Sequence, residues 1–191
     1  FLFGARDVWF VVGIPIYFYA VLSDGTKAGT QTAFFAIGIF MAIWIILYGL
    51  VQANTPRLLR AKQRGQGALI KDSATWVLVL AVVPAVLALV LYLTVSPSSV
   101  TTSVLVIGLL LFGAVFAVNS ALHSYLILAF TDSERVTMDV GFYYMSNAAG
   151  RLLGTVLSGL SYQLGGVWLC LALASAMLII SALGAHKLRS F

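Results

Sequence analysis

Long apolar runs, separated by short clusters of polar residues, glycine and proline, fill nearly the whole chain. A helix that crosses a bilayer needs about 20 predominantly apolar residues, and runs of this length recur six times. The pattern predicts an all-α polytopic membrane protein with one bundle over residues 1–191. Its transmembrane helices are expected at about 6–22, 30–54, 74–95, 101–130, 137–160 and 165–186.

Composition agrees with a protein that has little mass outside the bilayer. Of the 191 residues, 61% are hydrophobic and 9% are charged, whereas a soluble domain carries roughly 25% charged residues. The mean hydropathy is +1.03, so a water-soluble globule is excluded. The chain starts at Phe1 and is apolar at once. We therefore expect it to be a piece of a longer protein or a processed product.

Basic residues predict the orientation in the membrane. The long predicted connection at 55–73 holds five of the 11 basic residues and a single acidic one, Asp72, and basic loops stay on the cytoplasmic side. Alternation along six spans then places nine basic residues inside, Lys27 alone outside, and Arg151 within a span. Both termini are therefore expected on the cytoplasmic side of the inner (plasma) membrane.

Several function classes lack the residues that they need. The basic residues lie in connections between apolar runs. They do not form a patch on a soluble face together with side chains that contact bases, so the pattern does not indicate nucleic-acid binding. The lone Cys170 cannot form an internal disulfide, and no His/Cys cluster predicts a metal or cofactor site. His123 is the only histidine inside a span, and no serine elbow accompanies it, so we expect no enzyme and no catalytic residues.

The residue least expected in a bilayer is Arg151, which lies deep in the fifth predicted span. A charge at the centre of a membrane helix costs roughly 2.5–3.5 kcal/mol, so it marks a candidate functional site. At 100° per residue, Tyr143, Asn147, Gly154 and Ser158 share its face. We predict that Arg151 binds an anionic group while Asn147 and Tyr143 orient it. A structural arginine, paired to a carbonyl or to a carboxylate on a missing partner helix, is the alternative.

Other polar residues in the spans are further candidates. Asn119 and His123 lie four apart on the fourth span, where Asn119 would orient substrate and His123 would bind substrate, carry a proton or be structural. Arg6 and Asp7 start the first span as an exposed ion pair or as gating residues. Asp139 is either a first-turn acid that the helix dipole favours or a coupling residue. The aromatic side chains of the first two spans are interpreted as packing or lipid-facing, and these are Tyr17, Tyr19, Trp44 and Tyr48.

Gly150 and Gly154 form a small-xxx-small motif on the fifth span. Two glycines four apart let a neighbouring helix approach closely, and this motif is common in membrane helices. We interpret it as a packing site, with a hinge used in a transport cycle as the alternative.

Three stretches carry a family resemblance. They are residues 6–13 (RDVWFVVG) with Pro15, residues 48–53 (YGLVQA) ahead of Pro56, and residues 139–166 with DVGFYYM, GRLLG and SG. Together with six spans, cytoplasmic ends and a long basic connection, they resemble the carboxyl-terminal half of the organoarsenical efflux permease family (ArsJ) of the major facilitator superfamily. The resemblance covers nearly the whole chain.

The resemblance implies a three-plus-three inverted repeat that acts as an efflux antiporter by alternating access, completed by a missing amino-terminal six-helix half or a second chain. It implies arsenic resistance through export of 1-arseno-3-phosphoglycerate, a small anionic substrate that a partner glyceraldehyde-3-phosphate dehydrogenase makes from arsenate. An exporter of another organic anion or drug, or a non-transporting scaffold subunit, stays open. By resemblance, the residues on or near the path are Arg6, Gln52, Asn119, His123, Tyr143, Asn147 and Arg151.

Overall fold

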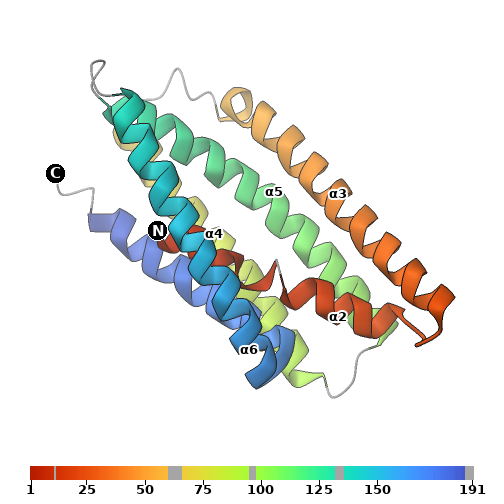
Figure 1. Ribbon diagram of the computed structural model, residues 1–191. Coiled ribbons are helices and arrows are strands. Elements are labelled where there is room, and N and C mark those ends of the chain that lie inside the picture. Colours follow the sequence, from red (N-terminus) through yellow and green to blue (C-terminus); the bar gives the residue numbers. More distant parts are fainter. Residues whose placement is uncertain (11, 60–65, 95–97, 132–135, 188–191) are drawn as a thin grey trace.

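The computed structural model describes residues 1–10, 12–59, 66–94, 98–131 and 136–187, and within these ranges the chain is all-α. The elements are α1 (Leu2–Ala5), the 3-10 helix η1 (Arg6–Trp9), α2 (Gly13–Leu22), α3 (Lys27–Leu58), α4 (Gln66–Leu93), α5 (Ser99–Phe130) and α6 (Val136–Lys187). The helices form one elongated bundle (Figure 1). The all-α prediction is therefore confirmed.

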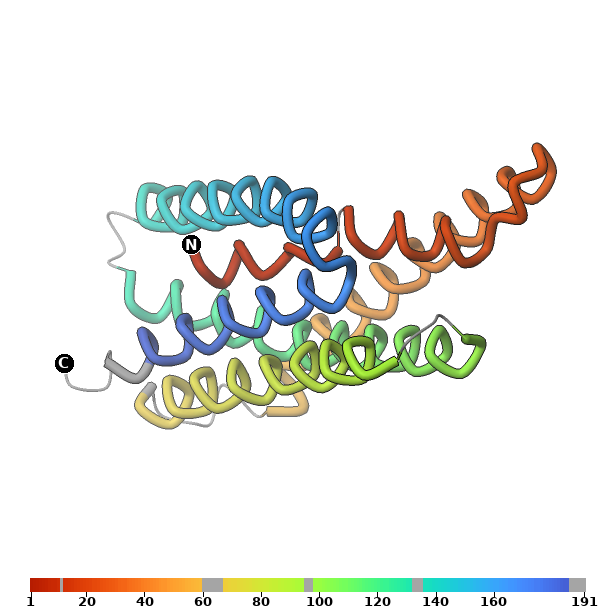
Figure 2. The backbone as a smooth tube through the Cα atoms, turned by 90° about the horizontal axis from the view of Figure 1, so that it is seen from below, coloured from red at the N-terminus to blue at the C-terminus, as the bar shows by residue number. Residues whose placement is uncertain are grey.

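Five stretches of the described chain are helical, long and apolar enough to cross a membrane. The fifth, Val136–Ala185, contains both the predicted fifth and the predicted sixth span. It is interrupted at Gly166, whose φ of 70° and ψ of −158° are not helical and suit a residue without a Cβ. Figures 1 and 2 show that the chain turns back here, and in Figure 2 the start of the chain lies between the two parts of α6. The described residues thus form five long apolar stretches, and the predicted six separate spans are not shown.

The ends of α3 and α4 depart from the predicted boundaries. α3 continues to Leu58 with Pro56 in its last turn, and α4 already begins at Gln66, so the predicted connection at 55–73 is partly helical. Arginine, lysine and glutamine are good helix formers, and a helix that leaves the apolar layer can continue in water. The hydropathy pattern therefore predicts where the chain leaves the apolar layer, which differs from where the helix ends.

The predicted first span is broken. α1 and η1 end at Trp9, and α2 starts only at Gly13. Pro15 follows two residues later and has no N–H to continue a helical ladder. The Gly13 N–H, which the break leaves without a partner in its own helix, donates to Ser158 Oγ of α6 at 3.1 Å. The break is therefore stabilised from a neighbouring helix.

The glycine motif of α6 lies against the start of the chain. A Cβ at Gly154 would lie 2.6 Å from the Ala5 carbonyl oxygen, and one at Gly150 would collide with the Phe1 carbonyl oxygen. The backbones of α1 and α6 thus approach more closely than side chains would allow. The interpretation of this motif as a packing site is confirmed, and the packing fixes residues 1–9 beside α6.

A short capped turn connects α2 to α3. Asp24 Oδ1 accepts hydrogen bonds from the Thr26 backbone N–H at 2.9 Å and from its hydroxyl at 2.7 Å, and the Thr26 hydroxyl oxygen caps α3 by accepting from the Gly29 N–H at 3.0 Å. The Thr26 hydroxyl bond, followed by the backbone bond, lowers the pKa of Asp24 below its ordinary value. The turn directs α3 back along the bundle.

α3 forms one edge of the bundle (Figure 1). It exposes large apolar side chains along most of its length, among them Phe34, Phe35, Ile39 and Ile46. Its opposite face contributes buried Ala33, Ile37 and Trp44 to the core. An apolar outer surface of this extent suits a lipid bilayer, so a multi-pass membrane protein is the plausible setting for this fold.

Candidate anion-binding pocket

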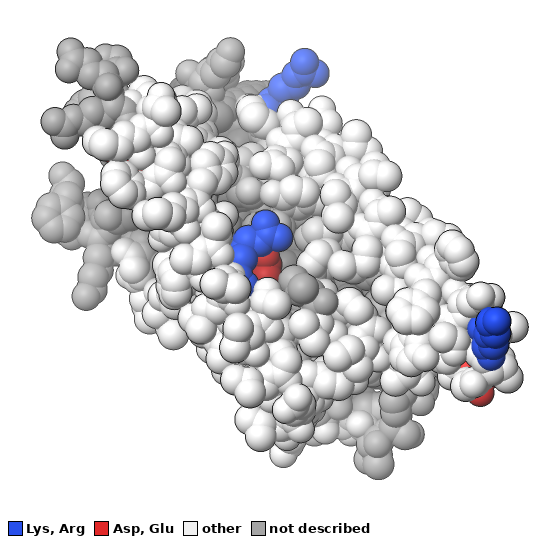
Figure 3. Space-filling model, viewed as in Figure 1, with Lys and Arg blue, Asp and Glu red and all other residues white. Residues whose placement is uncertain are grey.

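A pocket of about 410 Å³ opens in the middle of the bundle between α1, η1, α3, α5 and α6. Figure 3 shows a hollow at the centre of the viewed face, with a basic and an acidic group together at its mouth and uncharged side chains around them. The lining residues are Phe3, Arg6, Asp7, Trp9, Phe10, Trp44, Ile45, Tyr48, Gln52, Phe112, Phe116, Ser120, Ser124, Tyr143, Tyr144, Asn147 and Arg151.

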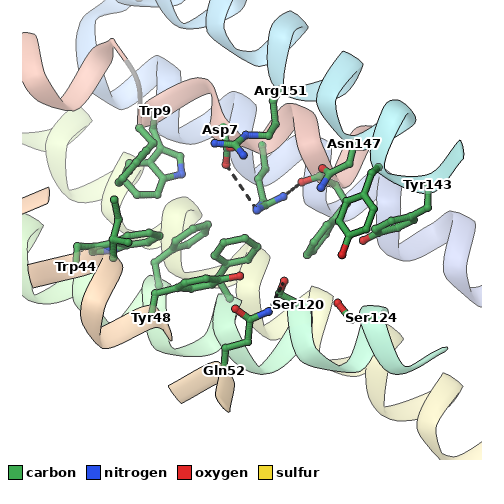
Figure 4. Close-up of a pocket in the computed structure, with 17 residues that line it drawn as sticks. Asp7, Trp9, Trp44, Tyr48, Gln52, Ser120, Ser124, Tyr143, Asn147 and Arg151 are labelled. Carbon is green, nitrogen blue, oxygen red and sulfur yellow. Dashed lines mark hydrogen bonds and ion pairs between the residues drawn. The ribbon is translucent and has the colours of Figure 1, made fainter. Parts of the chain in front are cut away.

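One side of the pocket is charged. The Arg151 Nε atom of α6 lies 2.9 Å from Asp7 Oδ2, and the Arg6 Nη2 atom lies 3.7 Å from Asp7 Oδ1. Figure 4 shows the labelled Asp7 and Arg151 side chains facing each other on this side. Two arginines against one aspartate leave the group with a formal charge of +1. A net positive charge in a partly enclosed site favours an anion.

Arg6 is held firmly in place. Its residue is 3% exposed, its Nη1 donates to the Phe3 carbonyl oxygen, and its guanidinium carbon lies 3.7 Å from the Phe116 ring centroid and 4.2 Å from that of Phe3. A guanidinium over an aromatic face gains cation–π stabilisation. Its buried Nε finds no hydrogen-bond partner among the described residues, so Arg6 keeps donor capacity unused.

Arg151 is less enclosed than Arg6. Its side chain is 61% exposed, in contrast to Arg6, and the ion pair with Asp7 is the contact that fixes its Nε. Arg151 is halfway between Val136 and Gly166, so it lies about 22 Å from each along the helix at 1.5 Å per residue. An arginine at this depth with a largely exposed side chain is well placed to bind an oxyanion.

Asn147 and Tyr143 come from the same face of α6 and line the same pocket. Figure 4 shows both on the side of Arg151. Asn147 Oδ1 is buried and has no hydrogen-bond partner among the described residues. This oxygen lies against the Gly4 backbone of α1, and as an acceptor it suits a hydroxyl group of a ligand rather than an anionic oxygen.

The opposite side of the pocket is aromatic. Trp44 and Tyr48 of α3 stack at a centroid distance of 5.7 Å, and Tyr48 stacks on Phe116 of α5 at 4.9 Å. Trp44 donates its indole N–H to the Leu109 carbonyl oxygen at 2.8 Å, which fixes its ring. Trp9 lies edge-on to Trp44, and no described residue accepts from its buried indole N–H. These rings form a rigid apolar wall.

Hydroxyl and amide groups complete this side. Gln52 Nε2 of α3 lies 3.5 Å from Ser120 Oγ of α5, and Ser124 lies one helical turn beyond Ser120. In Figure 4 these three side chains lie across the pocket from Asn147 and Arg151. The pocket therefore combines a cationic side with an aromatic side that carries neutral hydrogen-bonding groups.

The structure brings together six of the predicted residues, which are Arg6, Asp7, Gln52, Tyr143, Asn147 and Arg151. For Arg6 and Asp7 the expected location was wrong. They are 3% and 9% exposed instead of forming an exposed pair at the edge of the bilayer, because η1 turns them inward beside α6. Arg151 pairs with a carboxylate of this chain, Asp7, rather than with one on a missing helix, and its role in binding stays a prediction.

The other three predicted residues lie outside the pocket lining. Asn119 is fully buried, and its Nδ2 lies 3.5 Å from the Ser73 carbonyl oxygen of α4. The His123 ring packs on Phe3 at a centroid distance of 4.3 Å, and Asp139 lies in the first turn of α6. Direct contact of these three with a ligand in this pocket is not favoured, and the coupling roles of His123 and Asp139 stay predictions.

Sequence reasoning missed the aromatic wall. Trp44 and Tyr48 were interpreted as packing or lipid-facing, and Trp9, Phe112 and Phe116 were not singled out, yet all five line the pocket. Aromatic residues are frequent throughout this chain, so their type alone carries no signal. Their facing positions depend on how α3, α5 and η1 meet, which a single sequence does not reveal.

Within the described residues, no group of three or more His, Cys, Asp or Glu side chains is placed to hold a metal ion. Comparisons with protein-family models, with curated protein sequences and with solved structures found no match for this chain. The family resemblance stays a prediction for this reason. The chemistry of the pocket is therefore the main evidence for the function.

Proposed function

We propose that this chain is part of a membrane exporter of small organic anions that works by alternating access. The observation that carries the proposal is the central pocket, where Arg6 and Arg151 flank one carboxylate inside a bundle of apolar helices. Charges are expensive in a membrane interior and mark transport paths. Arginines, one with an unused Nε donor and one with an exposed side chain, are the side chains that bind carboxylate, phosphate or arsenate groups.

The broken first segment supports the same proposal. Transporters often place substrate sites where a membrane helix is interrupted, because the interruption exposes polar backbone and side chains to a cavity. Here the interruption between Trp9 and Gly13 directly follows Arg6 and Asp7, and Trp9 and Phe10 line the pocket. The interruption therefore delivers charged residues to the middle of the bundle without a continuous helix to shield them.

The resemblance extends the proposal to a specific substrate and architecture. We propose half of a major facilitator fold, with both termini cytoplasmic, in the inner membrane. Its substrate would be 1-arseno-3-phosphoglycerate, supplied by a glyceraldehyde-3-phosphate dehydrogenase. In this assignment Arg151 and Arg6 bind the anionic groups, and Asn147 and Tyr143 orient the glycerate body. The substrate carries more negative charge than the +1 of this pocket, so further cations from an amino-terminal half or second chain belong to the proposal.

The aromatic wall favours a second candidate, an exporter of amphipathic organic anions. Trp44, Tyr48 and Phe116 present stacked rings opposite the arginines, and such rings bind the apolar body of a ligand well. A phosphoglycerate ester has little apolar surface to place there. The two candidates share the arginine site and differ in what they need from the rings.

Transport into everted membrane vesicles tests the proposal. External glyceraldehyde-3-phosphate dehydrogenase, its cofactor, glyceraldehyde 3-phosphate and arsenate generate the labile ester, and arsenic captured in the vesicles is measured. Arg151→Ala and Arg6→Ala are each expected to lower uptake at least tenfold, since a hydrogen bond to a charged group contributes about 1.5–3 kcal/mol. The matched control is Arg57→Ala, at the exposed end of α3, which should keep wild-type uptake.

Equal uptake by wild type and both pocket variants would refute the assignment of the arginines. Arginine-dependent uptake of 1-naphthoate, without uptake of the arsenic ester, would favour the second candidate. A scaffold subunit would give no transport that depends on any pocket residue.

A further inference from the structure

The Asp7 carboxylate occupies the place that an anionic substrate needs. Its Oδ2 forms an ion pair with Arg151 Nε at 2.9 Å, and its Oδ1 forms one with Arg6 Nη2 at 3.7 Å. Asp7 therefore bridges the two cations of the pocket (Figure 4). An incoming oxyanion finds its natural binding groups already neutralised in part by a side chain of the protein.

The two arginines differ in their freedom to leave this bridge. Arg6 is 3% exposed and is fixed by the Phe3 carbonyl oxygen and the Phe116 ring. Arg151 has a side chain that is 61% exposed and reaches Asp7 from the mouth of the pocket. A partly solvated ion pair contributes only about 1 kcal/mol. The Arg151 side of the bridge is therefore the side that a ligand can open.

We infer, building on the proposed function, that Asp7 is a specificity-determining residue. It acts as a resident counter-ion that the anionic group of the substrate displaces from Arg151. In the empty pocket Asp7 offsets the repulsion between two cations in a low-dielectric site, which would otherwise destabilise the fold. On binding, Arg151 turns from Asp7 to the substrate, while Arg6 stays beside Asp7. The binding free energy then equals the interaction of Arg151 with the substrate minus its interaction with Asp7.

This competition sets what the pocket accepts. A group with more oxygens and more charge than a carboxylate, such as phosphate or arsenate, gains more from Arg151 than Asp7 does. A simple monocarboxylate only replaces one carboxylate by another. Only molecules in which Arg151 has left Asp7 can bind an anion. The apparent affinity for every anion is therefore reduced in proportion to the fraction of molecules in that state.

Calorimetric titration of the full chain in lipid nanodiscs, with 3-phosphoglycerate as the probe, tests the inference. Asp7→Asn removes the competing charge and is expected to tighten binding about tenfold, because opening a pair of about 1 kcal/mol is no longer needed and a like charge is gone. Arg151→Ala should weaken binding. Adding Asp7→Asn to Arg151→Ala should tighten binding by less than about twofold. Asp24→Asn, at the distant turn, is the matched control and should leave affinity unchanged.

Equal or weaker binding by a folded Asp7→Asn protein would overturn the inference, as would a full gain in the Arg151→Ala background. Arginine-dependent binding by wild type without the Asp7→Asn gain leaves the proposed function standing and refutes only the role of Asp7. An absence of binding by wild type and every variant overturns both.

A measurement on the wild-type protein covers the case in which Asp7→Asn does not fold. Infrared difference spectra with inorganic phosphate, which has no carboxylate band of its own, are recorded on protein with ¹³C-labelled aspartate. Displacement from Arg151 is expected to shift one aspartate carboxylate band on phosphate binding. Phosphate binding without any such shift would refute the displacement.

Discussion

Ser158 shows how one hydroxyl can support a break in a neighbouring segment. It is fully buried in α6 and accepts from the Gly13 N–H at the first residue of α2. A helix begins with N–H groups that its own turns cannot satisfy, and in an apolar bundle water is not at hand to replace them. Ser158 therefore stabilises the interruption that brings Arg6 and Asp7 inward.

Ser158→Ala is expected to lower the free energy of unfolding by about 1–3 kcal/mol, because the Gly13 N–H would stay buried without a partner. SDS titration followed by circular dichroism measures the change. Ser103→Ala is the matched control, since Ser103 is exposed and bonds only to the Ser99 carbonyl oxygen of its own helix. Equal losses in the two variants would contradict the capping role.

Residue chemistry made part of the site predictable and left part of it hidden. Arg151 was evident because a charge in an apolar run is rare, and helical periodicity placed Tyr143 and Asn147 on its face. Arg6 and Asp7 were placed at the rim because a continuous helix from residue 6 starts them at the surface. The 3-10 turn and the break after Trp9 move them inward, and both depend on packing against α6.

At the scale of elements, the close approach of α1 to α6 positions the charged side of the pocket. Gly154 lies against the Ala5 carbonyl, one residue before Arg6. A larger residue at 154 would push residues 1–9 away from α6 and lengthen the path between Asp7 and Arg151. The motif was predictable from its spacing, whereas the partner that it contacts was not.

Gly154→Ala is expected to destabilise the protein by about 1–3 kcal/mol through overpacking. Gly159→Ala, in the same helix with no atom within 4 Å of an added Cβ, should have no cost. The reaction of a thiol dye with Cys170 during heating measures both, because this single cysteine is fully buried. An unchanged melting temperature for Gly154→Ala would show that the backbones can separate freely.

At the scale of the whole molecule, the apolar pattern predicted the fold class and the approximate spans, since burial in lipid requires long apolar helices. The interruption at Gly166 lies two residues beyond the predicted connection at 161–164, inside the predicted last span. The pocket, in contrast, arises only where four distant segments meet. Its aromatic side could not be predicted without that assembly.

Topology provides a test at this scale. α3 has 32 residues, about 48 Å at 1.5 Å per residue, so its two ends should lie on opposite sides of the membrane. In a Cys170→Ala background, Ala28→Cys in intact cells is expected to react with a membrane-impermeant maleimide, and Asn54→Cys only after the cells are opened. The reverse pattern would contradict the cytoplasmic placement of the basic connection.

The packing of residues 1–9 against α6 also bears on biosynthesis. The first segment, Leu2–Leu22, is long enough to cross the apolar layer, but it carries Arg6 and Asp7, whose charges are costly in lipid until they are paired. The glycine motif, Ser158 and Arg151, which receive this segment, are translated more than 130 residues later. The contacts that fix this segment can therefore form only after residues 150–158 have been made, and before then its charges are stable only where water or lipid headgroups surround them.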